Sequence, residues 1–361
     1  MLESYLPKII TVKGNVFHLD KSFTVIGENI HATRVLMRTG KKIVENPHGY
    51  ESVLYKGVGG DTAYMTIPDD FKETQVYKEG RVKHFMIAVS KGTSFDTHEI
   101  DQGMKYISAE VGRQEKFGAH FLDLNIDEIS YKIDVQIKSM QWLVKHYCSV
   151  AKVPPSIDSS NIDIIKSGLE TYSSLNQPQG PPLVNSASLE RLEVLDLVKS
   201  YGAGVVVTAS GDDGMPSNAE QRCENVDKII AQCERRNIPY EKIHIDPLLF
   251  PISVDQSFGN HYLDAVKILR DQYGYSINIT GGLSNVSFGL PARRLINDTY
   301  IRLAMDVGVD SGIINPVESR IDRIMDLDME SEKVKIAKDL LLGRDEFCME
   351  FISSFREGKL K

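Results

Sequence analysis

Short apolar runs alternate with longer amphipathic stretches along the chain from residue 118 onward. Their brevity suits strands that are buried on both faces, because such strands have no polar side. The stretches between them repeat apolar residues at helical spacing, and one begins after a good helix N-cap, Ser217 or Asn218. The pattern predicts strands at 119–125, 153–158, 181–186, 204–210, 242–250, 276–282 and 311–316, with helices that include 162–172, 188–201 and 218–237.

The spacing of these runs indicates the fold class. Predicted strands begin roughly every 30 to 40 residues, which is about the length of one βα unit. A further apolar run at 23–30 brings the number of predicted strands to eight. Eight parallel strands close a TIM (β/α)8 barrel, although a doubly wound open sheet has the same local pattern. We therefore expect an α/β protein and favour the TIM barrel.

Residues 35–95 interrupt this rhythm with many turn residues and with charged, short strand-like pieces. The segment follows the first predicted strand and precedes a predicted helix near 97–117. We interpret it as an inserted lid or loop segment, while an ordinary surface loop of a barrel would show the same pattern. The expected organisation is an N-terminal extension (1–22), a barrel (23–345) that contains the insertion, and a C-terminal tail (346–361).

Composition excludes several classes of protein. Lys and Arg number 42 against 50 Asp and Glu, a net charge of −8 that argues against nucleic-acid binding. The opening residues lack a signal-peptide pattern, and no apolar run is long enough to span a membrane. No CxxC, HxH or HxxxH pair suggests a metal site. We expect a cytoplasmic, soluble protein without a bound metal, whose four cysteines, Cys148, Cys223, Cys233 and Cys348, form no disulfide framework.

Asp or Asn residues follow most of the predicted strands. In a parallel barrel all strand ends point to one rim, which is where such barrels carry their active sites. Any one of these residues could simply be turn or cap punctuation. The predicted rim is almost free of His, Lys, Arg and Cys, which favours a neutral, hydrogen-bonding ligand such as a 2-amino-4-oxopterin. The residues are Asn125, Asp158, Asn185, Asp246 and Asn285.

Several strings in this sequence resemble the pterin-binding barrel family: IGENIH, LDLN, SIDSSN, LVNSAS, IDPLLFP and above all GGLSNVSFGLPARRLIN. They are most similar to the corrinoid-dependent methyltransferases of that family, which act on methyltetrahydrofolate. Dihydropteroate synthase is a more distant relative. The resemblance covers roughly 23–34 and 97–345, and the GLSNVSFGLP stretch at 282–291 is its most specific part.

The resemblance implies roles for individual residues. The family's carboxylate, carboxamide and second carboxylate that hydrogen-bond the pterin match Asp158, Asn185 and Asp246. The family's asparagine in G-L-S-N approaches N5 of the folate and matches Asn285. We therefore expect Asn285 as the catalytic residue and a substrate-binding set of Glu28, Asn125, Asp158, Asn185, Asp246, Gly282 and Ser284.

Two features depart from the family pattern. The usual first-strand motif G-E-R-x-N reads Gly27-Glu28-Asn29-Ile30-His31 here, and the insertion at 35–95 follows it. Asp96-Thr97-His98 superficially resembles a cobalt-ligating motif, but it looks like a helix N-terminus. The corrinoid is therefore expected on a separate partner protein. The family also implies a homodimer.

The activity implied by the resemblance is one-carbon transfer, in which a methyl group moves between N5 of tetrahydrofolate and the cobalt of a protein-bound corrinoid. Asn285, with water that it orders, would hydrogen-bond N5 as its charge changes. Three alternatives stay open: a demethylase component that uses another methyl donor, a dihydropteroate synthase, and a pterin-binding barrel without turnover. The synthase fits poorly, because the loop around Asn285 lacks the lysine usual in that enzyme.

Overall fold

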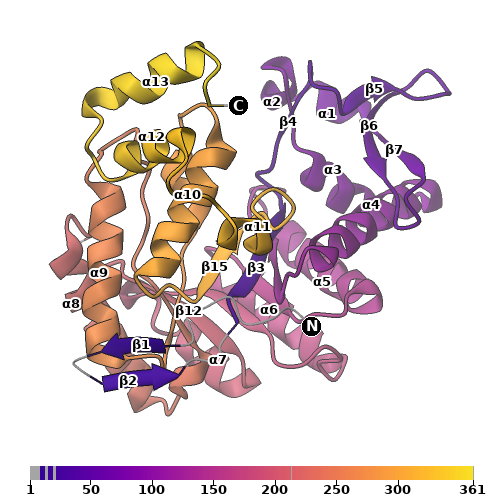
Figure 1. The fold of residues 1–361 in the computed structure, drawn as a ribbon. Coiled ribbons are helices and arrows are strands. Elements are labelled where there is room, and N and C mark those ends of the chain that lie inside the picture. Colours follow the sequence, from indigo (N-terminus) through magenta and orange to yellow (C-terminus); the bar gives the residue numbers. More distant parts are fainter. Residues whose placement is uncertain (1–8, 13–14, 19–21, 213, 361) are drawn as a thin grey trace. The chain divides into compact units, whose positions relative to one another are not determined.

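The computed structural model describes residues 9–12, 15–18, 22–212 and 214–360 (Figure 1). Part of the expected N-terminal extension, 1–22, therefore lies outside the described residues. The chain divides into two compact units. One is built from 27–185 and is called the 27–185 unit below; the second holds 186–361 together with the residues before Gly27.

Eight strands of one sheet alternate with helices along the chain, which confirms the predicted (β/α)8 fold class. Their order in the sheet follows the chain from β9 to β14 without the reversal that a doubly wound sheet would show. The eight are β3 (Thr24–His31), β9 (Phe121–Asn125), β10 (Pro155–Asp158), β11 (Leu183–Ala187), β12 (Gly204–Thr208), β13 (Ile243–Asp246), β14 (Asn278–Ile279) and β15 (Ser311–Ile314).

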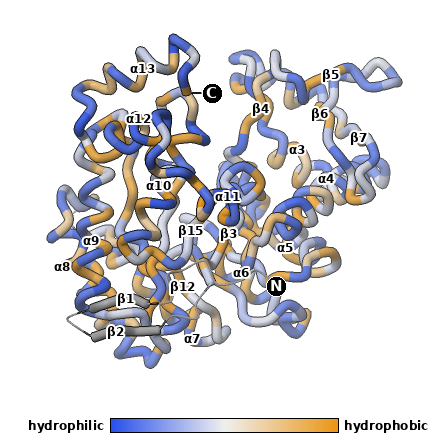
Figure 2. The backbone as a smooth tube through the Cα atoms, viewed as in Figure 1, coloured by the Kyte–Doolittle hydropathy of each residue, from blue (hydrophilic) through white to orange (hydrophobic). Residues whose placement is uncertain are grey.

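The helices that follow these strands are amphipathic, and hydrophobic and hydrophilic stretches alternate along α9 and α10 in Figure 2. None of the described helices is long and apolar enough to cross a bilayer. The 27–185 unit contains α4 (Thr97–Lys116), α5 (Ile133–Val150) and α6 (Ile162–Ser174). The second unit contains α7 (Val194–Tyr201), α8 (Ala219–Arg235), α9 (Phe258–Tyr273), α10 (Arg293–Asp306), α11 (Ile321–Met325), α12 (Glu332–Leu341) and α13 (Met349–Arg356).

Two helix starts behave as the sequence predicts. Asn218 is the N-cap of α8 and accepts a hydrogen bond from the Gln221 amide at 2.8 Å. Asp96 is the N-cap of α4, which identifies this segment as a helix start. The predicted helix at 188–201 differs in its first turn, which is a 3-10 turn (Leu189–Arg191), and α7 begins only at Val194.

The segment at 35–95 forms structure of its own in the 27–185 unit. Strands β5, β6 and β7 form a small antiparallel sheet. Strands β4 and β8, which precede and follow them in the chain, pair with each other, and α3 packs on α4. A side chain at Gly103 of α4 would lie 2.4 Å from the Ala88 carbonyl oxygen of α3, so glycine is needed for this close approach. The elements are β4 (Leu36–Met37), β5 (Ile43–Glu45), β6 (Glu51–Lys56), β7 (Thr62–Thr66), α1 (Asp69–Lys72), α2 (Gln75–Lys78), β8 (Arg81–Val82) and α3 (His84–Gly92).

Short elements complete the second unit. They comprise the antiparallel pair β1 (Ile9–Val12) and β2 (Asn15–His18), and the 3-10 turns η1 (Leu189–Arg191), η2 (Tyr240–Lys242), η3 (Leu283–Ser287) and η4 (Glu346–Cys348). Of these, η3 contains Asn285, the residue that the sequence predicts to be catalytic. The domain boundaries expected from the sequence stay a prediction.

Candidate functional site

Strand register gathers the polar side chains of the 27–185 unit. Asn125 of β9 and Asn185 of β11 both pair in register with Asp158 of β10. Because side chains alternate along a strand, Asp123 lies on the same face as Asn125, and Ser156 lies on the same face as Asp158. The three predicted residues, Asn125, Asp158 and Asn185, are therefore brought together with two deeper polar groups.

Asp123 is the centre of this cluster, although the sequence reading did not single it out. Its carboxylate accepts hydrogen bonds from Ser156 Oγ at 2.6 Å and from Asn185 Nδ2 at 3.1 Å. The side chain of Asn185 is therefore oriented by Asp123. The alternation of LDLN could have revealed this role, because it places Asp123 two residues before Asn125 on one face.

Asp123 and Asp158 form a coupled carboxyl pair that shares a hydrogen bond. Burial raises the pKa of Asp123 to about 6. Burial, followed by the charge of Asp123, raises the pKa of Asp158 well above its usual range. Two carboxylates this close oppose each other's ionisation, so the pair binds a proton more readily than two isolated carboxyl groups would. A ligand that offers N–H donors would favour the ionised form.

The second oxygen of the Asp158 carboxylate is oriented by neighbours. Asp158 Oδ2 accepts a hydrogen bond from Asn125 Nδ2 at 2.9 Å and lies 3.6 Å from His31 Nε2. His31 Nδ1 accepts from the Thr33 amide at 3.2 Å, which leaves the proton of a neutral ring on Nε2, facing Asp158. Burial lowers the pKa of His31 to about 4. The ring is therefore neutral at physiological pH and adds a dipole, not a charge.

Glu28 forms an ion pair with an arginine that the sequence reading overlooked. Glu28 Oε1 lies 2.5 Å from Arg34 Nη2, and Arg34 also donates to the Glu28 backbone carbonyl at 3.3 Å. The family's arginine at position 29 is missing here, and Arg34 supplies a guanidinium to Glu28 from further along the chain. Gly27 is needed for packing, since a side chain there would lie 2.4 Å from Gln114 Oε1.

In the second unit, Asp246 ends β13 with a carboxylate that is mostly buried. Asp246 Oδ1 accepts a hydrogen bond from the Leu248 amide at 2.8 Å. Leu248 has a φ of 67°, a left-handed conformation that is strained for leucine and typical of functional loops. Burial raises the pKa of Asp246 to about 6, against opposing effects of the Leu248 hydrogen bond and the charge of Arg222. The second unit therefore holds a buried carboxyl group whose ionised form an N–H donor would favour.

The Gly282–Ser287 loop holds the predicted catalytic residue in a fixed 3-10 turn. The Asn285 amide donates to the Gly282 carbonyl at 3.0 Å, and a side chain at Gly282 would lie 2.8 Å from Asn285 Nδ2. Arg293 braces the loop by donating to the Ser284 carbonyl at 3.1 Å and to Ser287 Oγ at 2.9 Å. Gly282, Ser284 and Asn285 therefore lie together.

The carboxamide of Asn285 makes no hydrogen bond to any other described residue. The helix after the loop, α10, has Ala292 at its N-cap and no side-chain cap bond, so Asn285 does not cap it. The loop thus presents one carboxamide whose donor and acceptor are both available. Among the described residues, no group of three or more His, Cys, Asp or Glu is arranged to hold a metal ion.

A family model of pterin binding enzymes matches residues 88–315, which is more than half of the chain. The chain belongs to this pterin-binding enzyme family, as the sequence resemblance predicted.

Two relatives with assigned names are similar to this chain, and both are methyltransferases. A methylcorrinoid:tetrahydrofolate methyltransferase of Eubacterium limosum is 28% identical over 252 residues, which cover 68% of this chain and 86% of that protein. A methionine synthase of Mycobacterium leprae (strain TN) is 27% identical over 217 residues, which cover 56% of this chain and 17% of that protein. These matches confirm the predicted enzyme class, a methyltransferase.

Solved structures confirm the fold class. Dihydropteroate synthase from Xanthomonas albilineans, in complex with 7,8-dihydropteroate, covers 88% of this chain and 96% of its own, with a TM-score of 0.52 and 15% identity. The Yersinia pestis enzyme with a pterine-sulfa conjugate gives a TM-score of 0.50 at 12% identity. At this identity the likeness concerns the fold alone.

Proposed function

We propose that this protein transfers a methyl group between N5 of tetrahydrofolate and the cobalt of a corrinoid carried by a separate protein. The observation that carries the proposal is the uncommitted carboxamide of Asn285 in the fixed loop Gly282–Ser287. The similarity to a named methylcorrinoid:tetrahydrofolate methyltransferase over 68% of the chain supports the same reaction. The corrinoid cobalt would accept or deliver the methyl group, and this chain would bind and orient the folate.

The pterin fits the buried carboxyl groups by its chemistry. Its 2-amino group and N3–H form a donor edge, which an ionised carboxylate accepts at two points. In our proposal Asp158 takes that edge in its ionised form, and a proton held by the Asp123–Asp158 pair is released to solvent on binding. Asn185, held by Asp123, and Asp246 hydrogen-bond other pterin atoms. Glu28 and Asn125 contribute indirectly. Glu28 forms an ion pair with Arg34, and Asn125 donates a hydrogen bond to Asp158.

Asn285 would act where charge changes during the reaction. A tertiary amine leaves a methyl group poorly unless N5 is hydrogen-bonded or protonated as the bond breaks. A carboxamide in a rigid loop can donate to N5 without reorganising, which favours the transition state over the ground state. A synthase joins a pterin diphosphate to an amine, forming a C–N bond and expelling diphosphate. That reaction would need cations for the leaving group, and 282–288 contains no Lys or Arg.

A spectrophotometric assay tests the proposal. The purified protein is mixed with cob(I)alamin and 5-methyltetrahydrofolate, and the loss of Co(I) absorbance is followed. Methylcobalamin with tetrahydrofolate tests the opposite direction. We expect protein-dependent transfer in at least one direction and its loss in Asn285→Ala. Tight pterin binding without transfer, with free cobalamin and with corrinoid proteins alike, would refute the proposal and leave a binding protein.

A further inference from the structure

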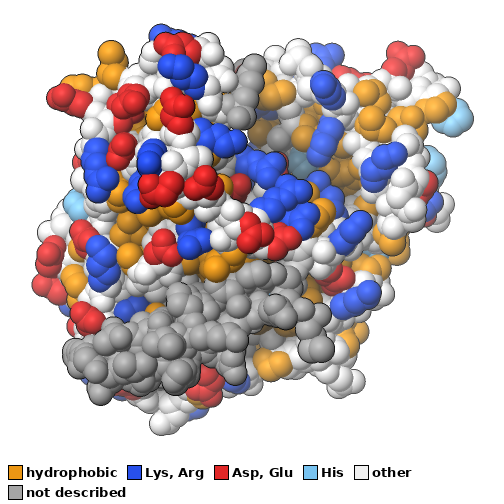
Figure 3. All heavy atoms as spheres, viewed as in Figure 1, with side chains coloured by type: hydrophobic (Ala, Val, Ile, Leu, Met, Phe, Trp, Pro, Cys, Tyr) orange, Lys and Arg blue, Asp and Glu red, His pale blue; other side chains and the backbone are white. Residues whose placement is uncertain are grey.

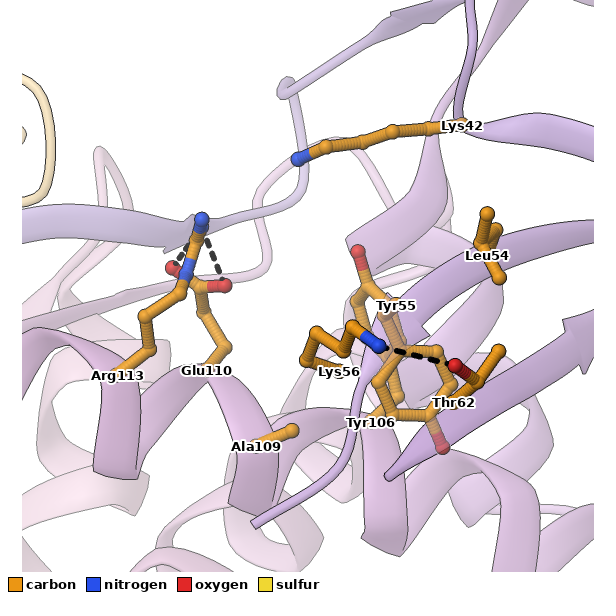
Figure 4. A pocket seen from close by; sticks show the side chains of 9 residues that line it. All are labelled: Lys42, Leu54, Tyr55, Lys56, Thr62, Tyr106, Ala109, Glu110 and Arg113. Carbon is orange, nitrogen blue, oxygen red and sulfur yellow. Dashed lines mark hydrogen bonds and ion pairs between the residues drawn. The ribbon is translucent and has the colours of Figure 1, made fainter. Parts of the chain in front are cut away.

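A hollow of about 330 Å³ lies in the 27–185 unit between the inserted strands β6 and β7 and helix α4 (Figure 4). It shares no residue with the candidate site described above, and none of its lining residues ends a barrel strand. Its β6 and β7 walls belong to the inserted segment and precede the part of the chain that matches the family model. A cavity of this size holds a small organic molecule.

The hollow is positively charged, although the chain as a whole carries −8. Lys42, Lys56 and Arg113 line it against one carboxylate, Glu110. Arg113 holds Glu110 through contacts of 2.7 and 2.6 Å, and Lys56 donates to the neutral hydroxyl of Thr62 at 3.0 Å. The ammonium of Lys42 has no hydrogen-bond or ion-pair partner among the described residues. Figure 4 shows it on the same side as the Glu110–Arg113 pair.

Two tyrosines form the aromatic wall of the hollow. The rings of Tyr55 and Tyr106 meet edge to face, with centroids 4.8 Å apart. Tyr106 is fixed from behind by a 2.8 Å hydrogen bond to Nδ1 of buried His84. Burial raises the pKa of Tyr55 to about 12, so its hydroxyl stays protonated and can donate. Figure 4 shows that hydroxyl on the Lys42 side of the hollow.

Two further observations concern the cationic side chains of the hollow. Arg113 Nε is buried and has no hydrogen-bond partner among the described residues, which is costly for a charged donor. Burial, with the charges of Lys42 and Arg113 among the further causes, lowers the pKa of His84 to about 3. These two positive charges therefore act on the ring behind the hollow, while the negative charges of Asp101 and Asp61 act on Tyr55. Figure 3 shows Lys and Arg side chains among hydrophobic ones over the β5–β7 region.

We propose that this hollow binds a small aromatic carboxylate. The carboxylate lies against the Lys42 ammonium and the Tyr55 hydroxyl, since charge-assisted hydrogen bonds are the strong ones. The ring packs against the two tyrosines, where aromatic rings attract one another edge to face or offset. Lys56 and Arg113 add attraction without direct contact being required. The site would be independent of pterin binding.

Binding of three simple probes tests both halves of the proposal. Benzoate carries the ring and the charge, benzamide the ring without the charge, and acetate the charge without the ring. We expect benzoate to bind with a dissociation constant of about 0.1–10 mM by ligand-observed NMR or calorimetry, a range set by its few atoms. Benzamide and acetate should each bind about tenfold more weakly or worse, because each loses one class of contact.

A matched pair of variants locates the site. Lys41 and Lys42 are adjacent and both exposed, but only Lys42 lines the hollow. Lys42→Gln should weaken benzoate binding about tenfold, while Lys41→Gln, which removes the same charge, should leave it unchanged. Both variants should keep the melting temperature of the parent protein. Equal losses in both variants would overturn the proposal, as would benzamide binding as tightly as benzoate, or no benzoate binding at ~50 mM.

Discussion

Replacing Asn285 by alanine separates a chemical role from a structural one. The structure gives the carboxamide no hydrogen bond to another described residue, and α10 is capped at Ala292 without it. The substitution therefore removes no interaction that holds the fold together. We expect the free energy of unfolding to change by no more than about 0.5 kcal/mol, the usual range for partly exposed positions of this kind.

The expected effect on the reaction is much larger. If Asn285 donates to N5 only as charge changes there, its loss resembles the loss of one preorganised donor in an active site. Such losses lower rates by about 10²-fold or more, which corresponds to about 2.7 kcal/mol or more of transition-state stabilisation. Binding of folate in the ground state should change much less, because the contact strengthens only during the reaction.

The assay is single-turnover methyl transfer at saturating folate, measured together with the melting temperature. Asn218→Ala is a matched control, since Asn218 caps α8 and donates nothing to the site. It should cost about 1 kcal/mol of stability and leave the rate per folded molecule unchanged. The reasoning is refuted if Asn285→Ala shows the same signature as this control, a lower melting temperature with a normal rate.

Three further predictions follow from the carboxyl groups. Asp158→Asn should weaken folate binding about tenfold to 150-fold, measured by calorimetry, with little change in the single-turnover rate; a rate loss at saturating folate would contradict a pure binding role. Folate affinity should rise as pH increases through the pKa of Asp246, about 6, because the donor-rich pterin needs the ionised form. The affinity at pH 5 should then be about tenfold or more below its plateau, and Asp246→Asn should make this dependence shallower, leaving the part that comes from the Asp123–Asp158 pair. Arg270→Met should destabilise the protein by about 3–5 kcal/mol in urea unfolding, since Arg270 Nη2 lies 2.9 Å from the fully buried Asp310.

The strands were predictable because burial leaves a direct mark on the sequence. A strand covered on both faces needs consecutive apolar residues, and each predicted run overlaps an observed strand, although β3 and β11 each end one residue beyond their run. For example, the run at 204–210 contains β12, Gly204–Thr208. The closure of the sheet was not predictable from periodicity, because it depends on strand order. That order became known only from the observed pairing.

The candidate site was predictable at strand ends and unpredictable behind them. Three polar residues lie at or near the ends of apolar strands, where the sequence pattern makes them easy to find: Asn125, Asp158 and Asn185. Asp123 lies inside an apolar run, and its role depends on register with Ser156 and on its bond to Asn185. Arg34 pairs with Glu28 across a turn that no motif records. Residues that meet only when the chain folds have no fixed spacing in the sequence, so such pairs cannot be predicted from one sequence.

The buried carboxyl groups bear on how the proposed pterin site would favour a neutral ligand in this acidic protein. An ionised carboxylate gains most from a neutral donor pair when no lysine or arginine already neutralises it. Asp158 contacts the Asn125 amide and the neutral His31 ring, and the charges of Asp123 and Asp127 oppose its ionisation. In the proposed complex the pterin edge supplies two donors, which favour the ionised form of Asp158. A cation near Asp158 would have lowered its pKa and satisfied it in advance, which would have left the pterin little to gain. In the proposed site, Asp158 would therefore favour a ligand with two N–H donors because no lysine or arginine among the described residues pairs with its carboxylate.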